Sequence, residues 1–404
     1  MGSLFEIKVS APGKVILHGE HSVMYGKFAI AGSLGLRSIS LCYFQEVESS
    51  VGSFVNVDLP SVNLKHSLSL DHIQSYLFKP STNGQLLWKN PQTVDHESHL
   101  IKVDKCLQSI NLNINDLNSV QYNSLRGMLY LISGIFGDTK FLNNSLDVSI
   151  NSGLTVGAGT GSSASYAVCL AGALIQLLKL KSGKSDEEFE MEDKILISAW
   201  AYNCEKIMHG SPSGIDNSTC TLGSLVGFRK GEEPIIPSFQ INLRILLVDT
   251  KVSRETKILA AKTMSLRQHN QNAVDCIMDA CDHIATTAFK VIYFRLSVTT
   301  GTRDFTSLFP RLELWNMNHC LLASLGVSHP SLEDIKASAT KHGLACKLTG
   351  AGGGGYAIVL IPPTTEQTLV ESLSNELKIK GYTVSDTQLG GPGVRIDHID
   401  VTNI

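Results

Sequence analysis

The feature that most constrains this chain is a glycine-rich stretch, VGAGTGSSAS, at residues 156–165. Three glycines alternate with small residues, two serines follow them, and the apolar run YAVCLAGALIQLLKL begins directly afterwards. Glycine lets the backbone approach an anion closely, and the unpaired N–H groups at the start of a helix attract phosphate. The pattern therefore predicts a phosphate-binding turn before a buried helix. The alternative is a tight structural turn in which Ser162 caps the helix.

Three other stretches look like nucleotide or metal motifs but lack the context that those motifs require. SGKS at 182–185 has no glycine at the upstream position of a Walker A loop. GAGGGG at 350–355 fits GxGxxG, yet the strand-like YAIVLI follows it, whereas a dinucleotide fingerprint leads into a helix. In HGEH, His18 and His21 are three positions apart on an extended segment, which is not the spacing of helical zinc ligands.

The remaining groups for phosphoryl transfer occur in three more stretches. Lys14 follows Pro-Gly in SAPGKVILHGEH, and EKIMHGSPSGIDN places Glu205 and Asp216 eleven positions apart across a turn-forming segment. KLTGAGGGG supplies a second loop of small residues. A phosphoryl transferase needs an anion cradle, a cation ligand, a positive charge and a group that orients the nucleophile. Taken singly, Lys14 could be a surface lysine and Asp216 could cap a helix that starts at Asn217. Together with the first loop, they predict a phosphotransferase.

Strand and helix patterns are mixed along the chain without a regular alternation. Segments rich in β-branched and aromatic residues predict strands within residues 5–60 and at LDVSI, RILLVDT, LACKL, YAIVLI and GVRIDHI. Apolar residues at helical spacing predict helices over VQYNSLRGMLYLISGIF, 193–208, parts of 254–342, and 365–380. Residues 62–145 are otherwise polar and could hold an insertion. We therefore predict an α+β protein of 404 residues whose second half begins near residue 240.

Composition excludes some classes of partner. The net charge is −3 and no block of basic residues occurs, so we expect no binding to nucleic acid or to an acidic membrane surface. The nine cysteines include no CxxC pair, which is typical of reduced, buried thiols. The longest apolar run, near 167–178, is shorter than the roughly 20 residues that span a bilayer. We expect a cytoplasmic protein.

Four stretches, in order, resemble the motifs of the GHMP small-molecule kinases, and among these most closely the kinases that act on mevalonate. They are APGKVILHGEHSVMYGK, GAGTGSSAS, EKIMHGSPSGIDN and KLTGAGGGG. The resemblance runs from Ser10 to about Gly393 and is weakest over 62–145. It implies a two-domain fold: residues 1–238 form a domain like domain 2 of ribosomal protein S5, with the nucleotide loop, metal and catalytic residues. Residues 239–404 form a ferredoxin-like C-terminal domain.

The resemblance implies that the chain transfers the γ-phosphoryl group of ATP to the C5 hydroxyl of mevalonate, for isoprenoid biosynthesis. It also implies a homodimer that prenyl diphosphates inhibit. Two alternatives remain open. One is another GHMP kinase, acting on phosphomevalonate or a sugar. The other is a ligand sensor without catalysis, although a sensor should have lost Lys14, Glu205 or Asp216, and the chain retains all three.

The same resemblance assigns roles to individual residues. The catalytic residues are Asp216, as the base, and Lys14, as the cation. Mg²⁺ is held by Ser163 and Glu205. The residues implied to bind ATP are Lys14, Ser61, Ser152, Gly157, Ala158, Gly159, Thr160, Gly161, Ser162 and Ser163. Those implied to bind the substrate are Glu20, His21, Asp216 and Thr250, and loop 349–355 is implied to close the cleft.

The chain departs from the family pattern at a few positions. Thr155 and Val156 stand where Pro-Pro is frequent, and Thr160 stands where Leu or Met is usual. Ser61 stands where an adenine-side Asn is frequent, which leaves the adenine contacts open. None of these departures removes a charge that phosphoryl transfer requires.

Overall fold

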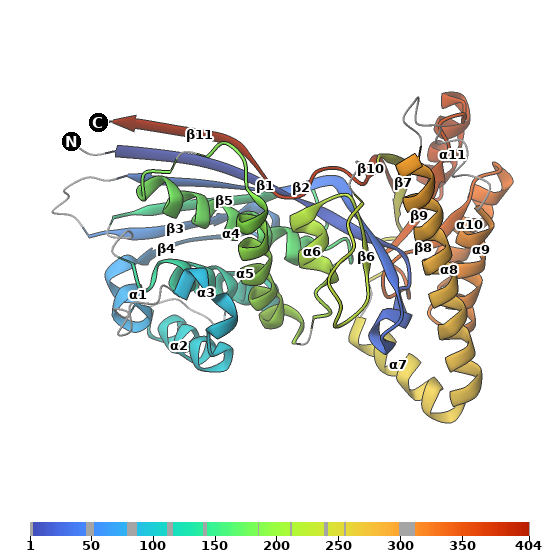
Figure 1. Ribbon diagram of the computed structural model, residues 1–404, viewed down its shortest axis with the longest axis horizontal. Coiled ribbons are helices and arrows are strands. Elements are labelled where there is room, and N and C mark those ends of the chain that lie inside the picture. The colour runs from blue at the N-terminus through green and yellow to red at the C-terminus, as the bar shows by residue number, and fades with distance from the viewer. Residues whose placement is uncertain are drawn as a thin grey trace.

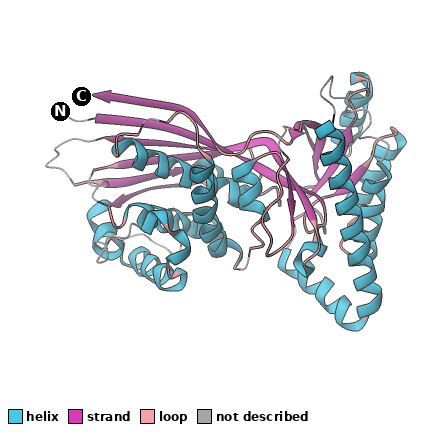
Figure 2. Ribbon diagram, viewed as in Figure 1, coloured by secondary structure: helices cyan, strands magenta, loops and turns pink. Residues whose placement is uncertain are grey.

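A computed structural model describes residues 3–45, 52–78, 87–110, 116–139, 144–184, 186–210, 212–237, 241–253, 256–298 and 312–403. Within these ranges eleven strands form one connected sheet, and helices pack along it in two groups (Figures 1 and 2). Helices α1 to α6 lie along the part of the sheet that carries both termini, and α8 to α11 lie along the other part. The α+β class predicted from the sequence is confirmed.

In its described residues, the first half of the chain has six strands and six α-helices. The strands are β1 (Ser3–His18), β2 (Ala29–Gln45), β3 (Phe54–Leu59), β4 (Leu64–Ser69), β5 (Leu146–Ser152) and β6 (Leu225–Phe228). The helices are α1 (Leu70–Leu77), α2 (His96–Ser109), α3 (Ser119–Phe136), α4 (Ser162–Lys181), α5 (Met191–His209) and α6 (Ile215–Leu222). Short 3₁₀ turns are η1 (His21–Tyr25), η2 (Pro60–Val62), η3 (Leu87–Lys89) and η4 (Pro91–Thr93).

The second half supplies the other strands and helices. Its strands are β7 (Leu243–Asp249), β8 (Cys346–Leu348), β9 (Tyr356–Ile361), β10 (Thr383–Leu389) and β11 (Arg395–Asn403). Its helices are α7 (Thr256–His269), α8 (Gln271–Val298), α9 (Leu312–Ser324), α10 (Pro330–Lys341) and α11 (Gln367–Ile379).

Strand β2 connects the two halves of the sheet. It pairs antiparallel with β1, β5 and β6, and it meets β10 at the pair Leu34 and Leu389. The last strand, β11, returns to the first half and pairs antiparallel with β1, so Ser3 lies opposite Asn403 (Figure 1). The predicted division at 238/239 falls on residues 238–240, outside the described residues, and remains a prediction.

Helix α4, which follows the first glycine loop, is the central helix of the first half. Its apolar residues lie on all sides and are buried against α3, α5 and the strands of this half, as expected for a core helix. Among the described residues it is the one helix long and apolar enough to cross a membrane, and 83% of its most apolar window is buried inside the protein. Its apolar character is therefore explained by its place in the core.

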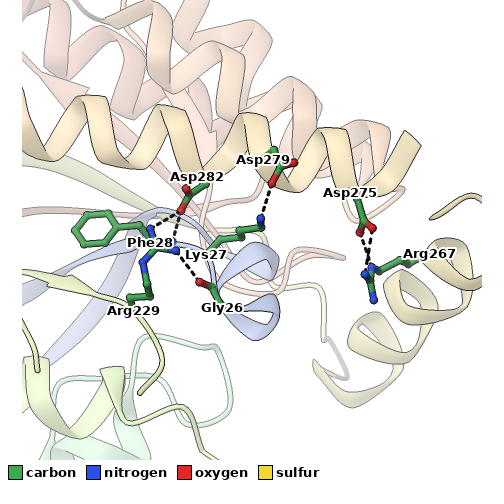
Figure 3. Close-up of polar contacts among 8 residues, drawn as sticks. All are labelled: Gly26, Lys27, Phe28, Arg229, Arg267, Asp275, Asp279 and Asp282. Atoms are coloured by element: carbon green, nitrogen blue, oxygen red, sulfur yellow. Dashed lines mark hydrogen bonds and ion pairs between the residues drawn. The ribbon is translucent and has the colours of Figure 1, made fainter. Parts of the chain in front are cut away.

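A row of aspartates fixes α8 against the start of β2 (Figure 3). Asp282 accepts hydrogen bonds from the backbone N–H of Phe28, at 2.5 Å, and from Arg229 Nη2, at 3.0 Å. Arg229 also donates to the carbonyl oxygen of Gly26, at 2.7 Å. One turn along α8, Asp279 forms an ion pair with Lys27. The segment that follows η1 is thus attached to the second half of the chain.

Most of the predicted elements are present, and several elements were not predicted. The helices at VQYNSLRGMLYLISGIF and 193–208 are confirmed as α3 and α5, and RILLVDT and YAIVLI are strands β7 and β9. The predicted helical region 254–342 contains α7 to α10, with residues 299–311 outside the described ranges. The sequence did not predict β4, β6, α1, α2 or β10, and for α6 it offered only a possible helix start at Asn217.

Candidate functional site

The first glycine loop joins β5 to α4 and has the backbone that its sequence predicts. Gly157, Gly159 and Gly161 have φ angles of 75°, 82° and 71°, the left-handed region that side chains disfavour. Helix α4 begins at Ser162, and its N-cap is Gly161, with no side-chain cap. The alternative in which Ser162 caps the helix is therefore wrong, because the chain enters the helix through a left-handed glycine.

Lys14 lies directly against this loop. Its backbone N–H donates to the carbonyl oxygen of Thr160, at 2.8 Å. A Cβ atom on Gly161 would lie 2.8 Å from Lys14 Cγ, so the absence of a side chain at this position makes room for the lysine. The side chain of Lys14 is buried, and its Nζ atom lies 3.1 Å from Asp216 Oδ1. The loop and the two charged groups are thus one site.

Asp216 is the second residue of α6, which begins at Ile215 after the left-handed Gly214. It therefore does not cap a helix that starts at Asn217, and that alternative is wrong. An aspartate in the first turn of a helix interacts favourably with the helix dipole, and Asp216 also faces the ammonium group of Lys14. The side chain of Asp216 is 28% exposed, whereas that of Lys14 is 6% exposed. The carboxylate is the more accessible partner of the pair.

Glu205, near the end of α5, contributes a second carboxylate. Its side chain is 1% exposed, and its Oε1 atom has no hydrogen-bond partner among the described residues. Burial, and secondarily the charge of Asp216, raises the pKa of Glu205 to about 8. A buried carboxylate with one oxygen left without a partner is costly, and a bound cation would offset that cost.

Ser163 and Glu205 both approach His209, the last residue of α5. The Oγ atom of Ser163 lies 3.0 Å from His209 Nε2, which is 3.7 Å from Glu205 Oε2. His209 was not among the predicted site residues, although its position four residues after Glu205 places both on one face of the helix. A hydroxyl and a carboxylate oxygen on adjacent elements are donors of the kind that Mg²⁺ prefers.

Within the described ranges, no three His, Cys, Asp or Glu side chains are grouped as they are in a metal site built from protein alone. A magnesium ion in a kinase site does not need such a group, because it takes much of its coordination from phosphates and water. The donor set of Ser163 and Glu205 therefore fits a metal that arrives with a nucleotide.

The second glycine loop brings residues of the second half to the end of β1. Five of its glycines have positive φ angles: Gly350, Gly352, Gly353, Gly354 and Gly355. The preceding Thr349 accepts a hydrogen bond from the backbone N–H of Ile16, at 3.1 Å, and its hydroxyl donates to the Ile16 carbonyl, at 2.8 Å. This loop therefore lies against the β1 segment that carries Lys14.

Two of the predicted substrate residues contact this second loop. His21 Nε2 donates to the carbonyl oxygen of Ala351, at 2.8 Å, and His21 Nδ1 lies 3.3 Å from the hydroxyl of Thr263 on α7. Thr250, after β7, donates through its hydroxyl to the carbonyl oxygen of Gly355, at 2.8 Å. The structure thus brings together residues from widely separated stretches of the sequence.

The third predicted substrate residue, Glu20, lies deeper. Its carboxylate forms an ion pair with Lys347 on β8, and its Oε2 atom accepts a hydrogen bond from Asn318 on α9, at 3.0 Å. The side chains of Glu20 and Lys347 are both fully buried. Neither Lys347 nor Asn318 was among the predicted site residues. Lys347 was detectable, because it stands at the start of the quoted motif KLTGAGGGG.

The predicted nucleotide residues outside the loop also lie close to one another. Ser61, in η2, accepts a hydrogen bond from the backbone N–H of Ser152, at 3.3 Å. The Ser152 hydroxyl accepts from the backbone N–H of Leu154, at 3.1 Å, just before the first glycine loop. The hydroxyl of Tyr356 donates to Thr155, at 3.0 Å, and so links the strand after the second loop to the first loop.

Comparisons with known proteins identify the family of the chain. Two family models match the chain: the GHMP kinases N terminal domain over residues 125–224 and the GHMP kinases C terminal domain over residues 306–379. The mevalonate kinase of Candida albicans is 36% identical over 408 residues, which cover 96% of this chain and 89% of that protein. The mevalonate kinase of Homo sapiens is 34% identical over 396 residues, which cover 96% and 94% of the two chains.

A solved structure shows the same fold. The crystal structure of L. major mevalonate kinase in complex with R-mevalonate matches with a TM-score of 0.65 at 21% identity, covering 96% of this chain and 96% of that one. At this identity the likeness concerns the fold alone, and the sequence relatives carry the family assignment.

Proposed function

The chain belongs to the mevalonate kinase family, and from this premise we propose that it transfers the γ-phosphoryl group of ATP to the C5 hydroxyl of mevalonate. The observation that supports this most directly is the contact between Lys14 and Asp216, at 3.1 Å, beside the first glycine loop. A buried cation and an accessible carboxylate at a phosphate-binding turn suit a reaction in which an alcohol attacks a phosphoryl group.

In the proposed reaction, the C5 oxygen forms a bond to the γ-phosphorus as the bond from that phosphorus to the ADP oxygen breaks. The proton of the attacking hydroxyl passes to a carboxylate oxygen of Asp216. Lys14 stabilises the negative charge on the transferring group, because its ammonium group is buried and held in place by the aspartate and the loop. Little assistance from a base is needed in a loose transition state, so positioning of the nucleophile is a large part of the role of Asp216.

The nucleotide is proposed to bind through the first loop. The N–H groups of residues 157–163 and the start of α4 face its phosphates, and Ser61 and Ser152 lie on its nucleoside side. Ser163 and Glu205 would hold the divalent cation, proposed to be Mg²⁺. When bound, that ion neutralises phosphate charge. His209 contacts Ser163 and lies close to Glu205, so it orients the serine hydroxyl when no ion is present.

The substrate is proposed to lie between the two glycine loops, against the turn that carries His21 and against Thr250. Further proposals follow from the family: residues 1–238 and 239–404 form two domains, loop 349–355 closes the cleft between them, and the enzyme is a cytoplasmic homodimer. Prenyl diphosphates are proposed as feedback inhibitors that use the nucleotide loop.

The proposal is tested by the release of ADP from ATP and Mg²⁺ in the presence of mevalonate, phosphomevalonate, galactose or homoserine in turn. We expect mevalonate to be strongly preferred. Equal or greater turnover with phosphomevalonate or with a sugar would assign the chain to another GHMP kinase activity. Binding of mevalonate without turnover of any substrate would instead support the sensor alternative.

A further inference from the structure

We propose that Lys347 is a positioning residue for the substrate-side turn, and that Glu20 is its buried counter-ion and does not bind the substrate directly. The inference deepens the proposed function and rests on it for the identity of the substrate. It concerns the segment from Ile16 to His21, which ends β1, begins η1 and carries a proposed substrate residue.

The partners of Glu20 are the first support. Each oxygen of its carboxylate already has a protein donor: Oε1 accepts from Lys347 Nζ, and Oε2 accepts from Asn318 Nδ2, at 3.0 Å. Lys347 Nζ also donates to the carbonyl oxygen of Leu348, at 2.6 Å. Neither charged side chain has any exposed surface. The Glu20 carboxylate is therefore bonded to protein groups through both oxygens, and it has no exposed surface that a ligand could contact.

The place of the pair in the chain is the second support. Residues 16–21 run beside residues 347–351, and the two segments are linked at three points. The hydroxyl of Thr349 bonds to both backbone groups of Ile16, Lys347 pairs with Glu20, and the carbonyl of Ala351 accepts from His21. The charged pair is the link next to His21, so its geometry sets where that histidine lies.

A charged link at this point fixes the position of residues 16–21 relative to residues 347–351. Burying two charges is expensive, and a buried pair seldom adds more stability than apolar side chains of the same size. What the pair adds is a penalty for any displacement, because a shift of the turn would leave a buried charge without its partner. Nearby His18 is not an alternative cationic partner for Glu20. It is buried against Trp315, and burial together with the charge of Lys347 lowers its pKa to about 3, so it is neutral.

The test is a double-mutant cycle in the full chain. Lys347→Met, Glu20→Gln and the double variant are compared with the wild type in urea unfolding and in steady-state kinetics, with mevalonate and ATP varied in turn. The matched control is Lys380→Met, which removes a lysine whose ion pair with Asp334 lies on the surface of the same half. Turnover of mevalonate by the wild type is measured first. If the wild type does not turn mevalonate over, the proposed function is rejected, and the urea measurements still test whether Lys347 and Glu20 depend on each other.

We expect Lys347→Met to lower the urea midpoint and to raise the KM for mevalonate by about tenfold, with the KM for ATP changed by less than about twofold. The double variant should recover to within about threefold of the wild-type KM for mevalonate, because it leaves no unpaired charge. The control should resemble the wild type. A double variant whose KM for mevalonate stays as high as that of Glu20→Gln would overturn the inference, since Glu20 would then contact the substrate.

A further outcome is that the effects of the two single substitutions on the urea midpoint are non-additive while their effects on the KM for mevalonate simply add. That result would also overturn the inference, because the ion pair would then stabilise the fold without positioning the substrate-side turn. Where Lys347→Met does not give folded protein, Asn318→Ala replaces it. This change removes the second donor to Glu20 and leaves the ion pair intact. It should raise the KM for mevalonate by about threefold and leave the KM for ATP unchanged. No change in either constant would overturn the positioning role.

Discussion

Lys14 Nζ lies 3.1 Å from Asp216 Oδ1, and it is the aspartate of this pair that reaches solvent. The two residues come from β1 and α6, and the loop residue Thr160 holds the backbone of Lys14 in place. The ammonium group is therefore fixed beside the glycine loop, and the carboxylate is the group of the pair that an incoming hydroxyl can reach.

Asp216→Asn keeps the shape of the side chain and removes the proton acceptor and the charge that faces Lys14. We expect kcat to fall by about 10²–10⁴, with little change in the KM for ATP. The measurement is steady-state ADP release with mevalonate in excess. Asp334→Asn, at a surface ion pair on α10, is the control and should retain wild-type kcat. A variant at position 216 with wild-type kcat would exclude the proposed base.

Glu205→Gln removes the charge of the proposed cation ligand and keeps its size. We expect a lower kcat and a higher Mg²⁺ concentration for half-maximal activity, because the remaining oxygen donors bind the ion more weakly. Titration with Mg²⁺ at saturating ATP measures both, and Mn²⁺ binding to the metal-free protein with nucleotide gives a readout apart from turnover. Rescue of Asp216→Asn by high Mg²⁺, without rescue of Glu205→Gln, would mean that the two roles are reversed.

Alanine substitutions at two glycines of the first loop separate the cost of backbone strain from the cost of a steric clash. A Cβ atom at Gly157 would meet nothing within 4 Å, whereas one at Gly161 would lie 2.8 Å from Lys14 Cγ. Gly157→Ala should cost about 1–2 kcal/mol in stability, from the left-handed backbone alone. Gly161→Ala should cost more and should also lower kcat, because it displaces Lys14. Urea unfolding and kinetics measure the two effects, and equal losses in both variants would contradict this assignment.

Because His18 is buried in its neutral form, we expect the free energy of unfolding to decrease in acid. Burial and the nearby Lys347 lower its pKa to about 3, from an ordinary 6.5. Between these two pH values the unfolded chain binds a proton that the folded chain does not, so the free energy of unfolding falls as pH falls below 6.5. The slope from this group is up to about 1.4 kcal/mol per pH unit. His18→Gln should make the profile shallower between pH 6.5 and 4.

The control for this prediction is internal. Above pH 7.5 His18 is neutral in both states, so the profiles of the wild type and His18→Gln should run parallel there. Urea unfolding across the pH range gives both slopes. Profiles that stay parallel down to pH 4 would show that His18 is not held neutral by the fold.

The family resemblance implies inhibition by prenyl diphosphates, and the first loop gives it a physical basis. A diphosphate offers the N–H groups of residues 157–163 the same oxygens that ATP offers. Burial of the tail would contribute about 0.8 kcal/mol per CH₂ group. We expect farnesyl diphosphate to inhibit more strongly than isopentenyl diphosphate, and to compete with ATP but not with mevalonate. Competition with mevalonate alone would place the inhibitor elsewhere.

Much of the first half of the site could be predicted from the sequence because its chemistry lies in short, contiguous motifs. The glycine loop, Lys14 and Asp216 were each visible locally, and the structure places all three together. The helix boundaries within these motifs were less accessible. The sequence allows Ser162 and Asp216 as caps, yet left-handed glycines are the N-caps of both helices. Serine and aspartate are frequent both at the N-cap and in the first turn of a helix, so the sequence alone does not tell these two positions apart.

The contacts between the halves could not be predicted. Glu20 and Lys347 are far apart in the sequence, and nothing local to either residue indicates that their charges neutralise each other in the interior. Helix α6 was not predicted beyond a possible start at Asn217, because only eight residues separate its glycine boundaries, too few for a helical period to show. Helix α2 was missed because its exposed face is polar and few of its residues are buried. In each case tertiary packing supplied what the sequence pattern lacked.

The return of β11 to β1 has a consequence for how the molecule is made. Ser3 pairs with Asn403, so the outer edge of the first strand synthesised stays open until the last strand has left the ribosome. At roughly 5–20 residues per second, the wait is on the order of 20–80 s. For that time an edge of hydrogen-bonding groups is available to any other nascent chain. Completion of the first half of this protein thus depends on the synthesis of β11, and a chain that is cut short before β11 would keep an unprotected edge on β1.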